Sequence, residues 1–474
     1  MTILDWALVA LYFVALIVIG AQTMKRIQNP DDFAVAGNRI IWPVFFGSLS
    51  AAFLGGGASI GNAGAAFSDG YVYMFAFFAF ALQTLLVGWL VAPRLKQYAG
   101  AHTVGDVMDA HYGKAARLLT GLLSLGLCAG ILGAQALAIG TVVNATVEID
   151  TTLAILIGMG VVILYSTFGG AWAVIQTDML QFVFLGVFLP IALIIGVWKA
   201  GGPAEMAAGL PDLHTSFLGA WTWPTFLSVF VAFLLGETLV PPYAQRTFAT
   251  PDSRHARLGF MLSGVFAFGF FFIAASLGMV ALSLFPDIEP DQALPTIVME
   301  LLPVGLVGLL VAALLAVVMS TASSYLNSIA VVFTKDIYLP FVDPDLSSSR
   351  RLWIERALSV MVGAAATVFA LTVPSIVDAL LYSYSLWAPT VIIPLLAAVL
   401  LGIRSAPAAV AAILVGGLVT AVWTWGVDEP FGVTGLVAGV AANLVTFVAV
   451  IATTGSGRST APVMSATTTS EEVS

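Results

Sequence analysis

The feature that most restricts this chain is a series of long apolar segments separated by short polar connections. Each segment holds about 20 or more mainly apolar residues, the length that an α-helix needs to cross the hydrocarbon core of a bilayer. The whole sequence is 60% hydrophobic and only 9% charged, with a mean hydropathy of +1.01. A soluble domain carries about a quarter charged residues, so this composition predicts an all-α, polytopic membrane protein.

Thirteen such segments are predicted, and they form a single transmembrane domain over residues 1–455. They fall at residues 4–23, 41–66, 71–93, 117–145, 152–170, 172–198, 223–249, 257–286, 304–334, 352–373, 375–402, 405–427 and 434–454. The first segment lacks a basic stretch before it, so we interpret it as a retained span and not as a secretory signal. Residues 456–474 are rich in Ser and Thr and are expected to form a disordered cytoplasmic tail.

The distribution of positive charge predicts the orientation. With the N-terminus outside, sixteen of the seventeen Lys and Arg residues fall on the inner side or at its boundary, and only Lys199 lies outside. The outer connections carry acidic residues instead, such as Asp69 and Asp287. By the positive-inside rule we expect a multi-pass protein of the plasma membrane, with an external N-terminus and a cytoplasmic C-terminus.

Two of the predicted spans contain residues that interrupt helices. Span 2 carries Gly55-Gly56-Gly57, and each glycine weakens a helix by about 1 kcal/mol relative to Ala. The alternative is that these glycines serve close helix packing. Span 7 carries Pro241-Pro242, which cannot donate backbone hydrogen bonds. Interruptions five spans apart predict two inverted five-helix repeats, spans 2–6 (about 41–198) and 7–11 (about 223–402), each starting with a discontinuous helix.

Polar side chains inside the spans are costly and therefore point to function. Asp178 lies in span 6 and Glu237 at the interruption of span 7. In span 9, Ser320, Ser323 and Ser324 share one helix face, with Thr321 about 100° away. Structural alternatives remain open: a helix-dipole contact for Asp178, a hydrogen bond from Glu237 to freed backbone, and helix packing for the hydroxyls.

These residues resemble the sodium:solute symporter family. The resemblance rests on Gly169–Gln181 and Ala316–Ser328, with weaker matches at Phe33–Arg39 and Ala244–Phe248. It covers almost the whole chain and implies the leucine-transporter fold, in which two inverted five-helix repeats carry extra helices at each end. It also implies that Na⁺ is the coupling ion.

The resemblance further implies two sodium sites. The main site would use the carbonyls of Ala51, Leu54 and Val317 with the hydroxyls of Ser320 and Thr321. A second site, known in some members, would use Asp178, Ser320, Ser323 and Ser324.

A substrate pocket is expected among spans 2, 4, 7, 9 and 11. Its candidate residues are Gly55, Gly56, Gly57, Ala58, Ser59, Phe77, Gln135, Glu237, Thr238 and Tyr382. No Lys or Arg is expected inside a span, so a substrate carboxylate would have to use backbone amides of span 2 and a helix N-terminus. Glu237 could pair with an amine, and Phe77 could instead face lipid. These features favour an amino-acid-like small organic solute over a sugar.

The predicted function is Na⁺-coupled solute uptake by alternating access. The alternatives are a proton-coupled carrier that uses Asp178 or Glu237, and, less favoured, a channel or a sensor. Nucleotide-binding, zinc-protease and nucleophile–histidine motifs are absent from the sequence, so an enzyme is not expected. The single cysteine, Cys128, and four scattered histidines indicate no disulfide framework or metal cluster. Beyond lipid and solute, no nucleic-acid or obligate protein partner is indicated.

Overall fold

The computed structural model describes residues 1–24, 34–98, 100–373, 375–455 and 457–458. Within these ranges the chain is helical almost throughout, as the apolar segments predict. The one sheet of the described residues pairs β1 (Ile403–Arg404) with β2 (Gly457–Arg458), antiparallel. Most of the predicted cytoplasmic tail, residues 459–474, lies outside the described residues.

Nine helices in the described ranges are long and apolar enough to cross a membrane, and a bent pair makes a tenth. They are Tyr71–Leu95 (α5, η3 and α6), Lys114–Val147 (α8), Val174–Lys199 in α9, Ser253–Leu284 (α14), Leu306–Phe341 (α16, η5 and α17), Ser349–Ala370 in α18, Ile376–Leu401 (α19), Ala406–Gly426 (α20 and η6) and Gly435–Thr454 (α21). The bent pair is Trp42–Phe53 (α3) with Gly57–Asp69 (η2 and α4). Each coincides with one predicted span.

The three other predicted spans correspond to shorter apolar helices. These are Ile3–Ala15 in α1 (Ile3–Met24), Thr151–Leu164 in α9 and Trp223–Leu235 (α12). The helical segment α9 runs from Thr151 to Lys199, 49 residues, and so contains both predicted spans 5 and 6. That length is more than twice what one crossing needs.

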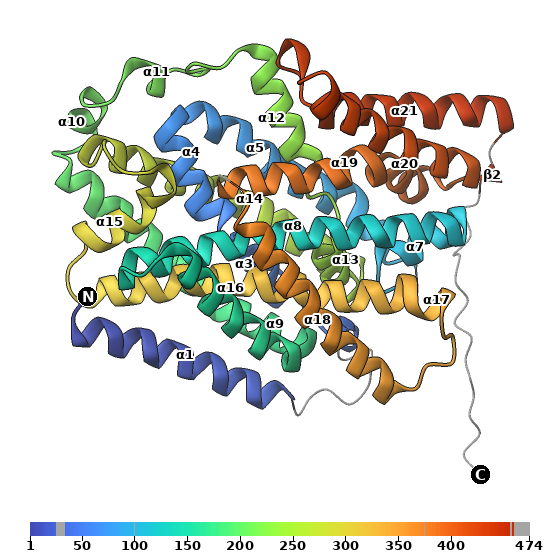
Figure 1. Ribbon diagram of the computed structural model, residues 1–474, viewed down its shortest axis with the longest axis horizontal. Coiled ribbons are helices and arrows are strands. Elements are labelled where there is room, and N and C mark those ends of the chain that lie inside the picture. The colour runs from blue at the N-terminus through green and yellow to red at the C-terminus, as the bar shows by residue number, and fades with distance from the viewer. Residues whose placement is uncertain (25–33, 99, 374, 456, 459–474) are drawn as a thin grey trace.

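The helices α8 and α16 (Leu306–Val332) form the centre of the bundle and pack side by side (Figure 1). Of the apolar window in Leu306–Phe341, 89% is buried inside the protein, more than for any other candidate span of the described chain. Around this centre the two halves exchange neighbours: α3 and α4 pack on α14, while α12 packs on α5 (Tyr71–Leu86). Each broken segment therefore contacts the first unbroken span of the other half.

The short helices gather at the two ends of the long ones (Figure 1). The N-terminus lies at the same end as α10 (Pro203–Ala208), α11 (Asp212–Thr215) and α15 (Ala293–Leu301), which follow spans predicted to end outside. The opposite end holds α7 (Val104–Tyr112), α17 (Leu339–Phe341) and β2. This arrangement is the one expected if connections alternate between two sides of a membrane.

The glycine run of span 2 interrupts the helix. The helix α3 ends at Phe53, the chain turns by 63°, and helical structure resumes at η2 (Gly57–Gly61) and α4 (Asn62–Asp69). The same glycines also allow close packing, since a Cβ on Gly57 would lie 2.1 Å from Leu380 Cδ1 and one on Gly56 would lie 2.3 Å from Ala138 Cβ. Both predicted roles of the run are therefore present.

Span 7 is interrupted as well. The helix α12 ends at Leu235, and α13 (Pro241–Phe248) begins at the two prolines. Between them Leu239 adopts φ 53°, a left-handed conformation that is unfavourable for a residue with a branched side chain. The Trp387 indole N–H donates to the freed carbonyl of Thr238 at 2.8 Å and so stabilises the break.

Candidate functional site

The end of α3 meets a hydroxyl of α16. Thr321 lies in the buried middle of α16, and its hydroxyl is 3.1 Å from the carbonyl oxygen of Ala52 and 3.1 Å from that of Val317. Ala51 and Leu54, the predicted carbonyl ligands on either side of Ala52, are fully buried there. Buried carbonyl and hydroxyl oxygens that lie this close together are suitable ligands for a dehydrated cation.

Gly55 is required for this approach. A Cβ on Gly55 would lie 2.7 Å from Thr321 Oγ1 and 2.6 Å from Gln135 Oε1, closer than non-bonded atoms can come. Gln135 projects from α8, and its side-chain carbonyl accepts a hydrogen bond from the Gly56 amide at 2.8 Å. The break in span 2 is therefore held between α8 and α16.

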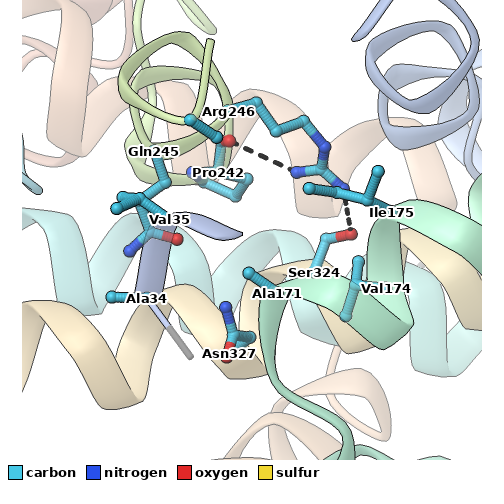
Figure 2. A pocket seen from close by; sticks show the side chains of 11 residues that line it. Ala34, Val35, Ala171, Val174, Ile175, Pro242, Gln245, Arg246, Ser324 and Asn327 are labelled. Carbon is cyan, nitrogen blue, oxygen red and sulfur yellow. Dashed lines mark hydrogen bonds between the residues drawn. The ribbon is translucent and has the colours of Figure 1, made fainter. Parts of the chain in front are cut away.

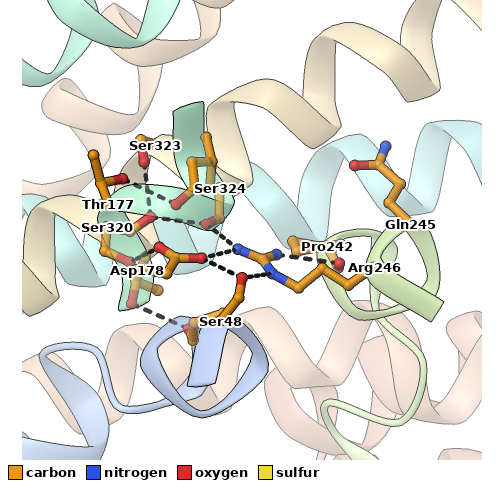
Figure 3. Close-up of polar contacts among 12 residues, drawn as sticks. Ser48, Thr177, Asp178, Pro242, Gln245, Arg246, Ser320, Ser323 and Ser324 are labelled. Carbon is orange, nitrogen blue, oxygen red and sulfur yellow. Dashed lines mark hydrogen bonds and ion pairs between the residues drawn. The ribbon is translucent and has the colours of Figure 1, made fainter. Parts of the chain in front are cut away.

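The carboxylate of Asp178, on α9, forms a second polar centre beside Ser320 of α16 (Figure 3). Its Oδ2 accepts hydrogen bonds from the Ser48 hydroxyl at 2.6 Å and from Arg246 Nη2 at 2.8 Å. Its Oδ1 accepts from Ser320. Asp178 is fully buried and the Arg246 side chain is only 6% exposed. This is a buried ion pair whose other lone pairs and protons are also satisfied, the arrangement that makes such pairs tolerable in a low dielectric.

Arg246 connects four elements through this centre. Its Nε donates to Ser48 of α3 at 3.0 Å, and Nη2 also donates to Ser324 of α16 at 2.7 Å. Nη1 donates to the Pro242 carbonyl at 3.2 Å, within α13. The guanidinium therefore joins α13 to α3, α9 and α16.

The predicted second sodium site coincides with this centre. In addition to Asp178, it comprises Ser320, Ser323 and Ser324. The hydroxyls of Ser323 and Ser324 donate to the Ser320 carbonyl at 2.9 and 2.8 Å. The guanidinium thus occupies the polar face on which a second Na⁺ would lie.

The expectation that no Lys or Arg lies inside a span is wrong for Arg246. The sequence places Arg246 near the inner end of span 7, where a long side chain normally reaches water. Because the helix breaks at residues 236–240, α13 begins anew deep in the protein and directs Arg246 toward Asp178. The helix-dipole alternative for Asp178 does not hold either, since its carboxylate lies in the middle of α9, away from any N-terminus.

A narrow cavity of about 20 Å³ adjoins the Asp178–Arg246 pair (Figure 2). It lies between Ala34 and Val35, the α9 residues Ala171, Val174 and Ile175, and the facing sides of α13 and α16. Gln245 Nε2 and Asn327 Oδ1 line it and have no hydrogen-bond partner in the described structure. This small cavity therefore holds two polar groups beside the ion pair.

A second small cavity, of about 10 Å³, lies at the two helix breaks; we call it the central cavity. Glu237 lines it from the break of span 7 and is largely buried. Its carboxylate accepts hydrogen bonds from Tyr243, and from Tyr384 at 2.6 Å. The predicted alternative, a bond from Glu237 to freed backbone, is not what the structure contains: both partners are tyrosine hydroxyls.

The remaining pocket candidates separate into two groups. Gly55, Gly57, Ala58, Phe77 and Gln135 line the central cavity. Phe77 is buried and stacks on Phe271 with ring centroids 4.2 Å apart, so it does not face lipid. Gly56, Ser59 and Thr238 are buried close by without lining the cavity, and the Thr238 hydroxyl accepts from Gln83 at 2.7 Å.

Tyr382 lies elsewhere, half-exposed in an apolar groove between α8, α18, α19 and α20. Two positions along a helix correspond to a rotation of about 200°, so Tyr384 occupies the face that Tyr382 was expected to hold. Sequence reasoning missed Tyr384, Tyr243, Tyr325 and Arg246. The Ala244–Phe248 motif could have indicated Arg246, which lies within it, and Tyr243, which precedes it. No sequence feature indicated how α19 is rotated.

The sequence matches the model of the sodium:solute symporter family over residues 33–419. Among curated relatives, the high-affinity choline transporter 1 of Drosophila melanogaster is 27% identical over 413 residues, 80% of this chain and 63% of the relative. Sodium/glucose cotransporter 4 of Danio rerio is 25% identical over 80% of this chain and 64% of its own length. The matches thus span slightly less than two thirds of these relatives.

Solved structures show the same fold. A Na⁺-coupled sialic acid symporter in a substrate-bound, outward-open state superposes with a TM-score of 0.79 at 20% identity, covering 94% of this chain and 98% of that one. A nucleobase-cation-symport-1 family transporter in a closed conformation gives a TM-score of 0.62 at 14% identity, covering 92% and 97%. The chain therefore has the leucine-transporter fold.

Proposed function

Because the chain belongs to the sodium:solute symporter family, we propose that it couples inward Na⁺ flow to uptake of a small organic solute by alternating access. The observation that carries this proposal is the position of Thr321. Its hydroxyl faces the carbonyl end of α3 at the point where span 2 breaks.

In the proposed main sodium site, Na⁺ replaces the hydrogen bonds that the Thr321 hydroxyl donates to the carbonyls of Ala52 and Val317. The ligands are the carbonyls of Ala51, Leu54 and Val317 and the hydroxyls of Ser320 and Thr321. Five neutral oxygens can replace the hydration shell of one Na⁺ without placing a net negative charge in the membrane. Binding would join α3 to α16 across the break and stabilise the substrate-ready arrangement through coupling free energy.

We treat the second sodium site as an alternative to the Arg246 ion pair. Arg246 and a second Na⁺ would both be cations on the same carboxylate, within a few ångströms, where their repulsion is strong in a low dielectric. Occupancy by Na⁺ therefore requires the guanidinium to withdraw from Asp178, a movement that would also release its bonds to Ser48 and Ser324.

We propose the predicted membrane arrangement of thirteen spans, with an external N-terminus and a cytoplasmic C-terminus at the plasma membrane. The positions of the short helices at the two ends of the bundle support it. The reciprocal packing of α3 and α4 on α14, and of α12 on α5, supports two inverted repeats related by exchange of neighbours.

Both cavities are contracted, since volumes of about 10 and 20 Å³ accommodate one or two water molecules. The central cavity borders the two breaks, and the other cavity borders Arg246 together with Ala34 and Val35, which lie in the predicted cytoplasmic connection between spans 1 and 2. We propose that solute enters the central cavity after the outer side opens, and that the ion leaves past Asp178 once the inner side opens.

The solute class is the least constrained part of the proposal. The family includes relatives named for choline, glucose and myo-inositol. The buried Glu237 favours a solute with an amine-type group, as in the amino-acid-like compounds that the sequence favours.

A thermal-stability screen of small solutes in Na⁺ and in K⁺ tests the proposal. A true substrate stabilises the purified protein more in Na⁺, because ion and solute stabilise the same state. Uptake of that solute into proteoliposomes should then require an inward Na⁺ gradient. Equal uptake in Na⁺ and K⁺ would contradict sodium coupling.

A proton-coupled carrier is the second candidate, and Glu237 is the observation that favours it. Among the described residues no Lys, Arg or His lies within ion-pair distance of this buried carboxylate, so it can hold a proton. Asp178 is less suited, because Arg246 stabilises its charged form. Uptake that follows a pH gradient and ignores Na⁺ would select this candidate.

A further inference from the structure

The central cavity contains one acidic group and no basic one. Glu237 contributes a carboxylate, whereas no Lys, Arg or His is among the described residues that line the cavity. A buried carboxylate without a cation is expensive, since two tyrosine hydrogen bonds do not replace its full hydration. The site therefore favours any ligand that brings a positive charge.

The walls around Glu237 suit a cation that also carries apolar groups. Phe77, Tyr243, Tyr325 and Tyr384 line the cavity beside it. The faces of aromatic rings attract cations, by about 0.5–1 kcal/mol when exposed and about 2 kcal/mol or more when dry. The buried Tyr325 hydroxyl adds one more polar group to the lining of the cavity.

The same cavity offers little to an anion or a carboxylate. Of the span 2 amides, which the sequence suggests as carboxylate ligands, that of Gly56 already donates to Gln135. The amides of Ser59 and Gly61 donate to the carbonyls of Gly55 and Gly56 at 3.1 and 2.8 Å. The Thr321 hydroxyl points to main-chain carbonyls. A carboxylate beside Glu237 would also meet like-charge repulsion.

We infer that the solute carried through this cavity is a small organic cation, a protonated amine or a quaternary ammonium without a carboxylate, whose positive group binds at Glu237 among the surrounding aromatic rings. This inference rests on the proposed transport function and narrows its solute class. It replaces the amino-acid preference of the sequence, because a zwitterion's carboxylate would lie beside Glu237 in a cavity that no described Lys, Arg or His lines.

Three matched probes separate charge from shape. Choline is a cation, 3,3-dimethyl-1-butanol is its uncharged carbon isostere, and glycine betaine carries the same ammonium with an added carboxylate. Ethanolamine and glycine form a second cation–zwitterion pair with a smaller ammonium. Binding to the purified full-length protein is measured in Na⁺ and in K⁺ by thermal shift and by equilibrium binding of labelled probe.

We expect at least one cation to bind at least about tenfold more tightly than both its isostere and its zwitterion, a difference of about 1.4 kcal/mol. In Glu237→Gln, which keeps the shape, accepts from one tyrosine through its amide oxygen and donates to the other through its amide N–H, that preference should disappear. The matched control is Glu355→Gln, which removes another buried carboxylate, paired with Arg351 on α18 and outside the cavity. It should keep the preference, and stabilisation of Glu237→Gln by Na⁺ alone should show that this variant is folded.

Three results overturn the inference: equal or tighter binding of the zwitterion or the isostere, an unchanged cation preference in Glu237→Gln, and failure of every cation to bind. The proposed sodium symport would be contradicted by a different result. Na⁺-dependent binding of glycine betaine or glucose contradicts the cation and leaves sodium coupling intact, whereas cation binding that is identical in Na⁺ and K⁺ contradicts sodium coupling alone.

Discussion

Arg246 Nη2 lies 2.8 Å from Asp178 Oδ2, and this ion pair joins α13 to α9 in a part of the bundle where both side chains are buried. Two residues that lie 68 positions apart in sequence thus neutralise each other's charge. Serine hydroxyls on α3 and α16 share the same carboxylate, so displacement of either partner changes the packing of four elements.

The first prediction concerns this pair. Arg246→Gln leaves Asp178 buried without a cation, which should destabilise the protein by about 3–5 kcal/mol in K⁺. Asp178→Asn combined with Arg246→Gln should cost less than the sum of the single changes, because no lone charge remains. Thermal unfolding in detergent measures both. Additive costs in the double variant would show that the two side chains are not coupled.

The same variant tests competition between Arg246 and a second Na⁺. Without the guanidinium, Na⁺ can bind Asp178 directly, so the Na⁺-induced rise in melting temperature should be larger in Arg246→Gln than in the wild type. The control replaces Na⁺ by K⁺ at constant ionic strength. An identical sodium response in both proteins would remove the argument for mutually exclusive occupancy.

Thr321 should be essential for the main sodium site. Thr321→Val keeps the side-chain shape and removes the hydroxyl, so Na⁺ loses one ligand and its affinity should fall roughly tenfold or more. Thr334→Ala is the control on the same span: its hydroxyl donates to the Ala330 carbonyl at 2.9 Å and also contacts Glu355, and neither residue is a proposed sodium ligand. Sodium titrations followed by thermal shift compare the two. Unaltered Na⁺ affinity in Thr321→Val would place the site elsewhere.

Gly55 sets how closely span 2 approaches span 9. Its replacement by Ala puts a methyl group 2.6–2.7 Å from two oxygen atoms, and overpacking of this kind costs about 1–3 kcal/mol. We expect lower stability and a weaker Na⁺ response. Gly160→Ala in α9 is the control, since its Cβ would meet no atom within 4 Å, and it should be neutral or slightly stabilising. Equal behaviour of the two variants would count against the close contact.

Asp291 in η4 (Pro290–Gln292) predicts a pH dependence at the end of the bundle that holds the N-terminus. Burial raises the pKa of this carboxyl from 3.8 to about 6; the Ile376 amide, which donates to it at 3.3 Å, lowers the pKa, and nearby Asp378 raises it further. The folded state therefore binds more protons than the unfolded state between about pH 4 and pH 6, so stability should rise as pH falls through 6. Asp291→Asn should flatten that rise in melting temperature. A rise of equal size in the variant would assign it to another group.

Hydropathy and breaker residues predict much of this fold because they report directly on local backbone chemistry. The glycines at 55–57 and the prolines at 241–242 weaken a helix wherever they occur, so both breaks lie where the sequence indicates. Helical geometry predicts which hydroxyls of α16 share a face. The family resemblance predicts that Thr321 lies near the end of α3.

Contacts that depend on how helices rotate and tilt were not predictable. Tyr382 and Tyr384 have similar surroundings in sequence, and only the rotation of α19 against its neighbours directs Tyr384 to Glu237 and Tyr382 to the surface groove. From the sequence, Arg246 is expected at the membrane boundary. In the structure a new helix, α13, begins inside the bundle after the break in span 7 and places Arg246 beside Asp178. Tertiary packing decided both.

The most direct test of sodium coupling is solute accumulation in proteoliposomes that contain only this protein. With radiolabelled choline, or whichever solute stabilises the protein most in Na⁺, uptake is followed under an inward Na⁺ gradient, an inward K⁺ gradient, and Na⁺ equal on both sides. We predict accumulation above the external concentration only with the inward Na⁺ gradient, and its loss in Thr321→Val but not in Thr334→Ala. Uptake of the same size and extent under all three conditions would contradict the proposed symport.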